Sequence, residues 1–160
     1  MKFTKSLIKG KLIKRYKRFF VDVKINKENV TAHCPNTGSM KGLLGEGNEV
    51  YLLKNNEPKR KLKYGLEIIR AKNNLVGINT HIANKIVNHG LTNNLINELK
   101  NRYKNKTEVF YNKETRFDFL IVKNNQKIFV EVKNVTLFRD KNTAEFPDAI
   151  TSRGSKHLLT

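Results

Sequence analysis

The sequence predicts an α+β protein with a small β-barrel over residues 1–80 and an α/β domain over residues 81–160. Short strand patterns separated by turn residues fill the first half. Apolar residues then recur at helical spacing from residue 79 to residue 103, and strand patterns return from residue 107 to residue 133. The change of period near residue 80 marks the expected domain boundary in a chain of 160 residues.

The expected strands of the first half are short and rich in β-branched and aromatic residues. They cover residues 7–13, 19–25, 29–34, 48–54, 61–71 and 75–79. Turn residues such as Pro35, Asn36 and Gly38 separate them. Five or six short strands in this space favour a small closed or partly open barrel. An OB-like barrel is one such fold, and it binds nucleic acid on its face.

The second half is expected to begin with helical segments. In residues 79–90, Ile82, Ile86 and Val87 lie at helical spacing, and Gly90 is expected to end the helix. Residues 91–103 continue a helical pattern. Three strands should follow, at residues 107–112, 115–122 and 126–133.

Positive charge is the strongest compositional signal. The chain has 32 Lys and Arg against 14 Asp and Glu, a formal net charge of +18. Such a charge attracts polyanions, although a composition biased toward Lys, Asn and Ile would also raise the lysine content. The basic residues are clustered, which favours nucleic-acid binding. The cluster residues expected to contact DNA are Lys14, Arg15, Lys17, Arg18, Arg60 and Lys61.

Several classes of protein are excluded or disfavoured by the sequence. Cys34 is the only cysteine, so an intramolecular disulfide is impossible, which fits a reducing compartment. No segment approaches the roughly 20 apolar residues of a membrane span, and no apolar leader segment is present. No zinc-ligand spacing, Walker motif or GxGxxG loop occurs. We therefore expect a cytoplasmic protein without a membrane partner or small-molecule cofactor, and the oligomeric state stays open.

Asp118, Glu131 and Lys133 form the strongest candidate site for chemistry. Glu131 and Lys133 are two apart on an expected strand, so their side chains share a face, and Asp118 lies on the preceding strand. Two close carboxylates could bind Mg²⁺, which activates water for phosphodiester hydrolysis while the lysine orients that water or neutralises charge. A solvated strand with a cross-strand charge pair is the alternative. The apolar neighbours on both strands make unpaired charges costly there.

Two further features are weaker candidates. Glu98, on the expected second helix, could add a third carboxylate to the metal site, and Glu108 is a similar candidate. In the turn of residues 33–40, Asn36 and Thr37 could meet a phosphate with the exposed main-chain N–H groups. An ordinary barrel turn is at least as good an explanation.

Eight motifs of this chain occur in an order that resembles one known family. They are KRYKRFFVDV (14–23), HCPNTGSM (33–40), RKL (60–62), INT with HIAN (78–84), RFDF (116–119), VEVKNVTL (130–137), FPDA (146–149) and TSRGSKHL (151–158). The set resembles the SfsA (sugar fermentation stimulation protein A) family over nearly all of the chain.

The resemblance implies an N-terminal OB-type barrel joined to a PD-(D/E)xK restriction-endonuclease-like domain. It implies DNA binding without strong sequence preference and an effect on sugar (maltose) metabolism genes. By motif position, the nuclease-like residues fall on Asp118, Glu131 and Lys133. Arg116 matches the family's arginine and is expected to contact nucleic acid, while Thr115 replaces the more usual serine. Family members continue beyond Thr160, so we expect a C-terminally truncated, incomplete nuclease-like domain.

Three functions follow as hypotheses. The first is a largely sequence-non-specific DNA-binding protein, and the second is a Mg²⁺-dependent nuclease. The third, weaker one is a sugar- or nucleotide-binding regulator that uses the turn of residues 35–40.

Overall fold

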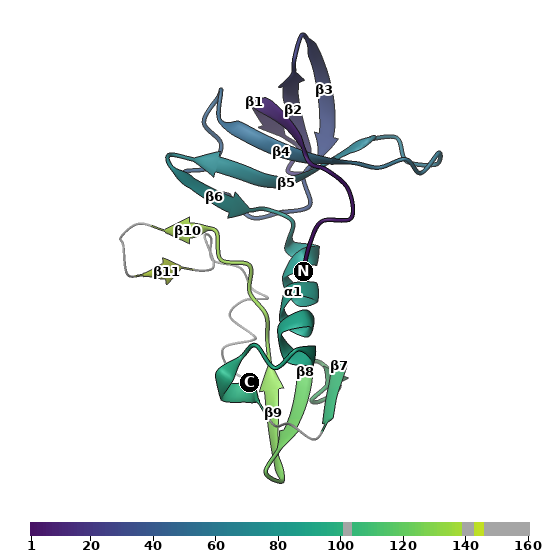
Figure 1. Cartoon of the computed structure of the whole chain (residues 1–160), viewed down its shortest axis with the longest axis vertical. Coiled ribbons are helices and arrows are strands. Elements are labelled where there is room, and N and C mark those ends of the chain that lie inside the picture. The colour runs from purple at the N-terminus through teal and green to yellow at the C-terminus, as the bar shows by residue number, and fades with distance from the viewer. Residues whose placement is uncertain (101–103, 139–142, 146–160) are drawn as a thin grey trace. The chain divides into compact units, whose positions relative to one another are not determined.

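The computed structural model describes residues 1–100, 104–138 and 143–145, and these fall into two compact units. The first unit consists of residues 2–81 and the described residues of 134–145. The second unit consists of residues 82–100 and 104–133. Figure 1 shows the elements of both units. Each unit has its own buried apolar cluster. Within the described residues, no helix is long and apolar enough to cross a membrane.

The first unit contains a closed five-stranded barrel, which confirms the expected OB-like fold. Its sheet runs in the order β3-β2-β1-β4-β5-β6, and pairing of β3 with β5 closes the barrel. The strands are β1 (Ile8–Tyr16), β2 (Phe20–Ile25), β3 (Glu28–His33), β4 (Glu49–Lys54), β5 (Tyr64–Ala71) and β6 (Asn74–Gly77). All six expected strands are therefore present. β1 extends further than expected, through a register shift between Leu12 and Lys14 that lets it bend around the barrel.

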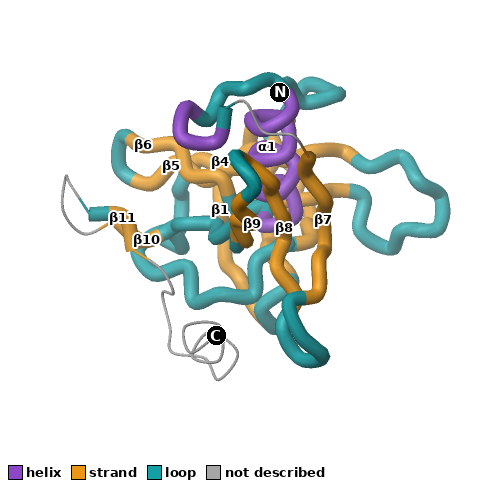
Figure 2. The backbone as a smooth tube through the Cα atoms, turned by 90° about the horizontal axis from the view of Figure 1, so that it is seen from below, coloured by secondary structure: helices purple, strands orange, loops and turns teal. Residues whose placement is uncertain are grey.

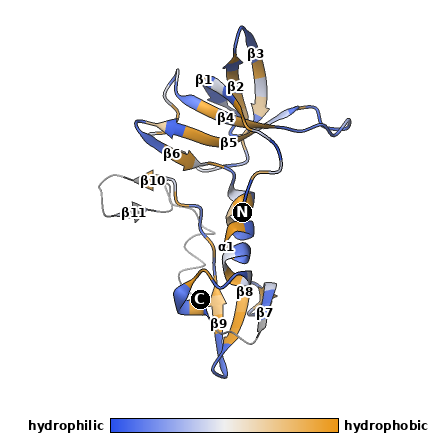
Figure 3. Ribbon diagram, viewed as in Figure 1, coloured by the Kyte–Doolittle hydropathy of each residue, from blue (hydrophilic) through white to orange (hydrophobic). Residues whose placement is uncertain are grey.

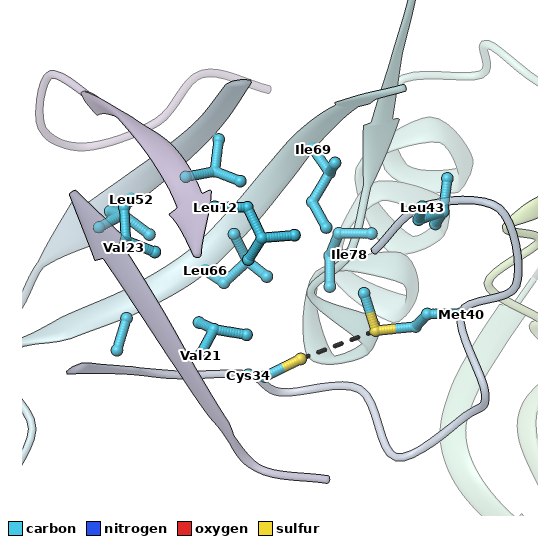
Figure 4. Packing of buried hydrophobic residues seen from close by; sticks show 12 residues of the cluster. Leu12, Val21, Val23, Cys34, Met40, Leu43, Leu52, Leu66, Ile69 and Ile78 are labelled. Atoms are coloured by element: carbon cyan, nitrogen blue, oxygen red, sulfur yellow. Dashed lines mark hydrogen bonds between the residues drawn. The ribbon is translucent and has the colours of Figure 1, made fainter. Parts of the chain in front are cut away.

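Alternating apolar side chains fill the barrel. Val21 and Val23 of β2 are fully buried, as are Val50 and Leu52 of β4, because every second residue of a strand faces inward. Figure 4 shows Val21, Val23 and Leu52 among the buried side chains of the barrel. It also shows Cys34 and Met40 from the loops, whose sulfur atoms lie 3.7 Å apart. Burial raises the pKa of the Cys34 thiol, so the thiol stays protonated and acts as a small apolar group.

The second unit is a three-stranded antiparallel sheet with a helix packed on it. The strands β7 (Lys104–Phe110), β8 (Arg116–Lys123) and β9 (Gln126–Val130) lie side by side in that order (Figures 1 and 2). The helix α1 (Thr80–Thr92) supplies Val87 and Leu91 to a cluster around Phe119 and Ile121 of β8. Figure 3 shows that β8 and β9 are mainly hydrophobic, as the sequence indicated.

The expected end of the helix at Gly90 is wrong. α1 continues through Gly90 and ends at Thr92, and Asn94, two residues later, has a positive φ of 54°. The N–H groups of Asn94 and Leu95 donate to the carbonyls of Leu91 and Gly90, which is the Schellman pattern of a helix C-terminus.

The expected helix over residues 91–103 is also wrong within the described residues. Only the short 3₁₀ helix η1 (Asn97–Leu99) follows α1. Its neighbour Ile96 instead packs against the apolar cluster. Of the apolar residues that suggested a second helix, Leu91 belongs to α1, Leu99 packs on the same cluster and Leu95 is exposed.

The chain leaves the sheet earlier than expected. β9 ends at Val130, so Glu131 and Lys133 lie outside the strand. The following residues join the first unit, where the amide of Asn134 donates to the carbonyl of Gly77 at 3.2 Å. There β10 (Leu137–Phe138) pairs with β11 (Ala144–Glu145). The motifs at 146–149 and 151–158 lie outside the described residues.

Candidate functional site

The two basic clusters of the first unit meet at one end of the barrel. Tyr16 of β1 pairs with Phe20 of β2, Phe20 pairs with His33 of β3, and His33 pairs with Gly65 of β5. The loop of residues 17–19 and the end of the loop of residues 55–63 therefore lie around His33. These are the loops between β1 and β2 and between β4 and β5, which bind oligonucleotides in OB folds.

The pKa of His33 supports this convergence. It lies below the usual value, first because the ring is partly desolvated and second because Arg60 and His81 place positive charge nearby. Arg60 belongs to the second basic cluster, so its charge reaches the strand end where the first cluster emerges. Arg60 also forms an exposed ion pair with Glu57, at 3.2 Å.

Lys17 and Arg18 of the first cluster are exposed. Both have positive φ angles, 47° and 62°, although neither is a glycine. Each such conformation costs about 1 to 3 kcal/mol and is often found where a tight turn or function requires it. The strained turn holds both cationic side chains in solvent at the tip of the β1–β2 hairpin.

Arg15 has a different role from its neighbours. It pairs with the buried Val21, so its side chain starts on the inner face of the barrel. Its guanidinium donates to the carbonyls of Asn36, Gly38 and Arg18 at 2.7, 2.8 and 3.0 Å. Arg15 therefore holds the turn of residues 35–40 against the barrel, a structural task that the basic cluster did not indicate.

Asn36 also has a structural task. Its side chain is buried, and Oδ1 accepts the N–H of Gly38 at 2.8 Å, which forms a tight turn. Thr37 is exposed at the tip of this turn, as are Lys14 and Lys61 in their own segments. Of the expected DNA contacts in the first unit, Arg15 and Asn36 are thus engaged internally, while the others face solvent.

Sequence reasoning missed the aromatic side chains at this end of the barrel. The rings of Tyr16 and Phe20 stack with centroids 5.5 Å apart, and those of Phe19 and His33 with centroids 6.5 Å apart. Lys14 Nζ lies 5.8 Å from the centroid of the Tyr16 ring. The alternation of rings and cations in KRYKRFF was the signal that could have found them.

In the second unit, the structure brings Asp118 to the segment that contains Glu131. At this end of the β8–β9 pairing, Phe119 lies opposite Val130. Asp118 and Glu131 are the next residues on the two segments. Oδ2 of Asp118 accepts the N–H of Val132 at 2.7 Å. Lys133 Nζ pairs with Oε1 of Glu131. The three predicted residues are thus neighbours, although two of them follow the strand rather than belong to it.

Asn84 is a member of this site that the sequence did not reveal. It lies on the same side of α1 as Val87 and Leu91, three and seven residues later. Its Nδ2 donates to Oδ1 of Asp118 at 2.7 Å. The Asp118 carboxylate is therefore oriented by the helix on one oxygen and by the main chain of Val132 on the other.

Glu108 on the edge strand β7 and Arg116 on the central strand β8 lie near Asp118. Glu108 has a positive φ of 52°. It is the one residue from Lys104 to Phe110 that has no partner in the β7–β8 register. Its carboxylate pairs with Arg116 Nε at 3.0 Å, and both side chains are half exposed. Arg116 therefore already has an acidic partner, and its guanidinium also lies over the ring of Phe110.

The structure does not bring Glu98 to the pair. Glu98 lies in η1, and its carbonyl accepts Lys123 Nζ at 2.8 Å. Lys123 is the last residue of β8, five residues beyond Asp118, which is about 17 Å along a strand. Among the described residues, no group of three Asp, Glu, His or Cys side chains gathers in a way that could hold a metal ion.

The comparisons with known proteins identify the family. Residues 13–78 match the model for the SfsA N-terminal OB domain, and residues 81–160 match the model for the sugar fermentation stimulation protein RE domain. The chain belongs to the SfsA family. Its fold is accordingly an OB barrel followed by part of the SfsA restriction-endonuclease-like domain.

Relatives within the SfsA family match nearly the whole chain. A sugar fermentation stimulation protein homolog of Pelagibacter ubique is 75% identical over all of this chain and 69% of its own length. The homolog of a Marinomonas species is 46% identical over 99% of this chain and 62% of its own length. The chain thus spans about two thirds of the length of the relatives that it matches.

A solved SfsA structure has the same architecture. The Pyrococcus furiosus SfsA, solved in complex with Ca²⁺, is similar with a TM-score of 0.84 and 26% identity. The match covers 99% of this chain and 67% of that chain.

The side chains around Asp118 are of the kind that hold a divalent cation. Mg²⁺ is usually held by one or two carboxylates, and water and substrate phosphate supply the other ligands. Asp118 and Glu131 provide two carboxylates on adjacent segments of the chain. The two hydrogen bonds to Asp118 keep its oxygens in place. Such a cation would therefore take most of its other ligands from water or phosphate.

Proposed function

We propose that this SfsA chain binds DNA without strong sequence preference, through the end of the barrel that carries both basic loops. The observation that carries the proposal is the strand register around His33, since it brings the loop of residues 17–19 and the loop of residues 55–63 to one end. A net charge of +18 adds long-range attraction to polyanions. Phosphate contacts from Lys and Arg side chains give affinity that does not depend on sequence.

The test is binding to duplexes of unrelated sequence at several salt concentrations, measured by fluorescence anisotropy. We expect similar affinities for all duplexes and a steep decrease with salt. Lys17→Ala and Lys61→Ala should each reduce the slope of log K against log salt by about one. Lys27→Ala is the matched control, since Lys27 is exposed in the β2–β3 turn at the other end of those strands. Affinities that differ by more than about 10³-fold between duplexes would overturn the proposal.

The effect on sugar metabolism belongs to the same proposal. The relatives carry the name sugar fermentation stimulation protein homolog. Binding of this chain to DNA near genes of sugar (maltose) metabolism would connect that name to a molecular activity.

A second candidate function is a Mg²⁺-dependent DNA nuclease at Asp118, Glu131 and Lys133. The pairing of Asp118 with the segment of Glu131 favours it, and so does the Ca²⁺ bound by the Pyrococcus furiosus relative. A bound cation would supply an activated water and stabilise the charge that develops on the phosphodiester. Asp118 and Glu131 would hold that cation, Asn84 would keep Asp118 oriented, and Lys133 would neutralise charge on the phosphate.

This candidate is tested by plasmid cleavage in Mg²⁺, Mn²⁺ or EDTA. Glu131→Gln should abolish metal-dependent nicking and leave DNA binding unchanged or stronger. Glu114→Gln, an exposed change in the β7–β8 turn, is the control that should cleave like the parent. Cleavage that persists in both EDTA and the Glu131→Gln protein would eliminate this site.

A further inference from the structure

We propose that the outer face of β1, β2 and β3 binds single-stranded DNA by stacking bases on the rings of Tyr16 and Phe19. This inference rests on the proposed DNA binding. It adds that the preferred DNA is single-stranded, and it names the side chains that select it. The two rings on which the bases would stack are not basic residues.

The rings lie on the outside of the barrel. Directly paired residues of adjacent strands share a face, so Tyr16, Phe20 and His33 point to the same side. Val21 follows Phe20 in β2 and Ala32 precedes His33 in β3, and both are fully buried on the opposite side. The paired residues therefore form a surface outside the apolar core.

The rings are arranged in two nearly parallel pairs. The planes of Tyr16 and Phe20 differ by 18°, and those of Phe19 and His33 differ by 3°. In each pair the inner ring supports an outer one that remains accessible, 36% for Tyr16 and 46% for Phe19. A supported, exposed ring is a rigid platform, because little conformational freedom remains to be lost when a base stacks on it.

The charges around the rings match a nucleic-acid backbone. Along the chain, Lys14 precedes Tyr16, and Lys17 and Arg18 lie between Tyr16 and Phe19. All three cationic side chains are exposed. Asp22 is the acidic group on this face, and it accepts hydrogen bonds from Tyr16 at 3.2 Å and from Thr31 at 2.8 Å. Asp22 thus fixes the Tyr16 ring, and we expect the phosphates to follow the Lys17 and Arg18 side of the rings.

The combination selects single strands over duplexes. In a duplex the faces of the bases are stacked on each other, and only phosphates and base edges are accessible to these side chains. A single strand offers both phosphates and ring faces, and alternating cations and exposed rings are the pattern that binds it without sequence preference. A purely electrostatic surface would not need Tyr16 or Phe19.

The first experiment uses Phe19→Trp as a reporter, because the chain contains no other tryptophan. A single-stranded oligonucleotide of about 16 nucleotides and the duplex of the same length are titrated at matched salt. Anisotropy of labelled DNA reports binding, and indole fluorescence reports stacking. We expect the single strand to bind more tightly and to quench the indole, and the duplex to bind with little quenching.

The second experiment separates stacking from charge. Phe19→Leu keeps an apolar side chain but removes the ring, and it should weaken single-strand binding about 5- to 150-fold, the usual range for one stacked base. The salt slope and the duplex affinity should stay as they are. Phe19→Tyr should restore single-strand binding. Leu75→Ala removes another exposed apolar side chain of the same sheet and should have no effect.

The outcomes distinguish the two proposals. If neither DNA binds, the proposed DNA binding fails and the inference fails with it. If both DNAs bind equally, without quenching and without a loss in Phe19→Leu, DNA binding stands and the stacking inference is overturned.

Discussion

Asn84 of α1 donates a hydrogen bond of 2.7 Å from Nδ2 to Oδ1 of Asp118 on β8, across 34 residues of sequence. The main-chain N–H of Val132 occupies the other oxygen of the same carboxylate. A helix and the segment after a strand therefore orient one acidic group. This contact connects the packing of the second unit to the geometry of its candidate metal site.

Asn84→Ala should destabilise the second unit. It removes the donor to a half-buried carboxylate, and hydrogen bonds to charged groups contribute about 1.5 to 3 kcal/mol to the free energy of unfolding. Urea unfolding followed by circular dichroism measures the loss. Asn88→Ala, the same change at an exposed position one turn later, should alter stability by less than about 0.5 kcal/mol. Equal effects of the two changes would mean that the contact with Asp118 contributes nothing.

Arg15→Ala should destabilise the barrel, whereas a DNA-contacting residue would affect only binding. Its loss leaves the carbonyls of Asn36 and Gly38 without their donors, which costs about 2 to 4 kcal/mol in unfolding free energy. Arg15→Lys should recover only part of this, because lysine cannot reach several carbonyls with a planar fork. Thermal unfolding is the measurement, and Lys11→Ala on the exposed side of β1 is the control. An unchanged melting temperature in Arg15→Ala would contradict the structural role.

The stability of the barrel should respond to the protonation of His33. Because burial and the charges of Arg60 and His81 lower its pKa in the folded state, the unfolded chain binds the proton first as the pH falls. The contribution of His33 is present above about pH 6.5 and is lost as the pH falls through the lower folded pKa. Comparison of melting temperatures between pH 8 and pH 5 should give a steeper fall for the parent than for His33→Gln. Parallel curves would show that His33 does not titrate in this way.

Glu49 should stabilise the outer surface of the barrel down to strongly acidic pH. Hydrogen bonds from Lys9, Tyr51 and Arg70 lower its pKa to about 2. Its contribution is therefore complete above its ordinary value of 4.5 and is lost as the pH falls through about 2.

Glu49→Gln tests this contribution. The variant should melt below the parent at pH 6, and the difference should shrink as the pH approaches 2. Glu46→Gln, at an exposed position of the preceding loop, should match the parent throughout. A difference between Glu49→Gln and the parent that does not change with pH would assign the effect to packing rather than to charge.

The strands of this protein could be predicted because their signals are local. Alternation in β2 and β4 is visible within six residues, and turn residues such as Pro35 and Gly38 lie next to the strands that they separate. The end of α1 could not be predicted in the same way. Gly90 suggested a stop, but the helix ends at Thr92 and the chain turns at Asn94, where Ile96 can pack back on the core.

The residues of the candidate sites also differ in whether a local sequence pattern reveals them. Asp118, Glu131 and Lys133 could be singled out from an Asp followed by a Glu-x-Lys pattern on the expected strands, although β9 ends at Val130. Asn84 could not, because no local pattern relates a helical amide to a carboxylate 34 residues later. In the sequence, Arg15 is one basic residue among others, and only its pairing with the buried Val21 distinguishes it from Lys14 and Lys17.

The sequence by itself determined the α+β class, the six strands of the first unit, the large positive charge and the motifs of the SfsA family. These depend on residue type and on periods of two or about four residues, which the linear chain carries in full. The tertiary structure decided which basic side chains face solvent and which loops meet. The physical reason is barrel closure: the pairing of His33 with Gly65 fixes which strand ends lie together, and that register is a property of distant segments.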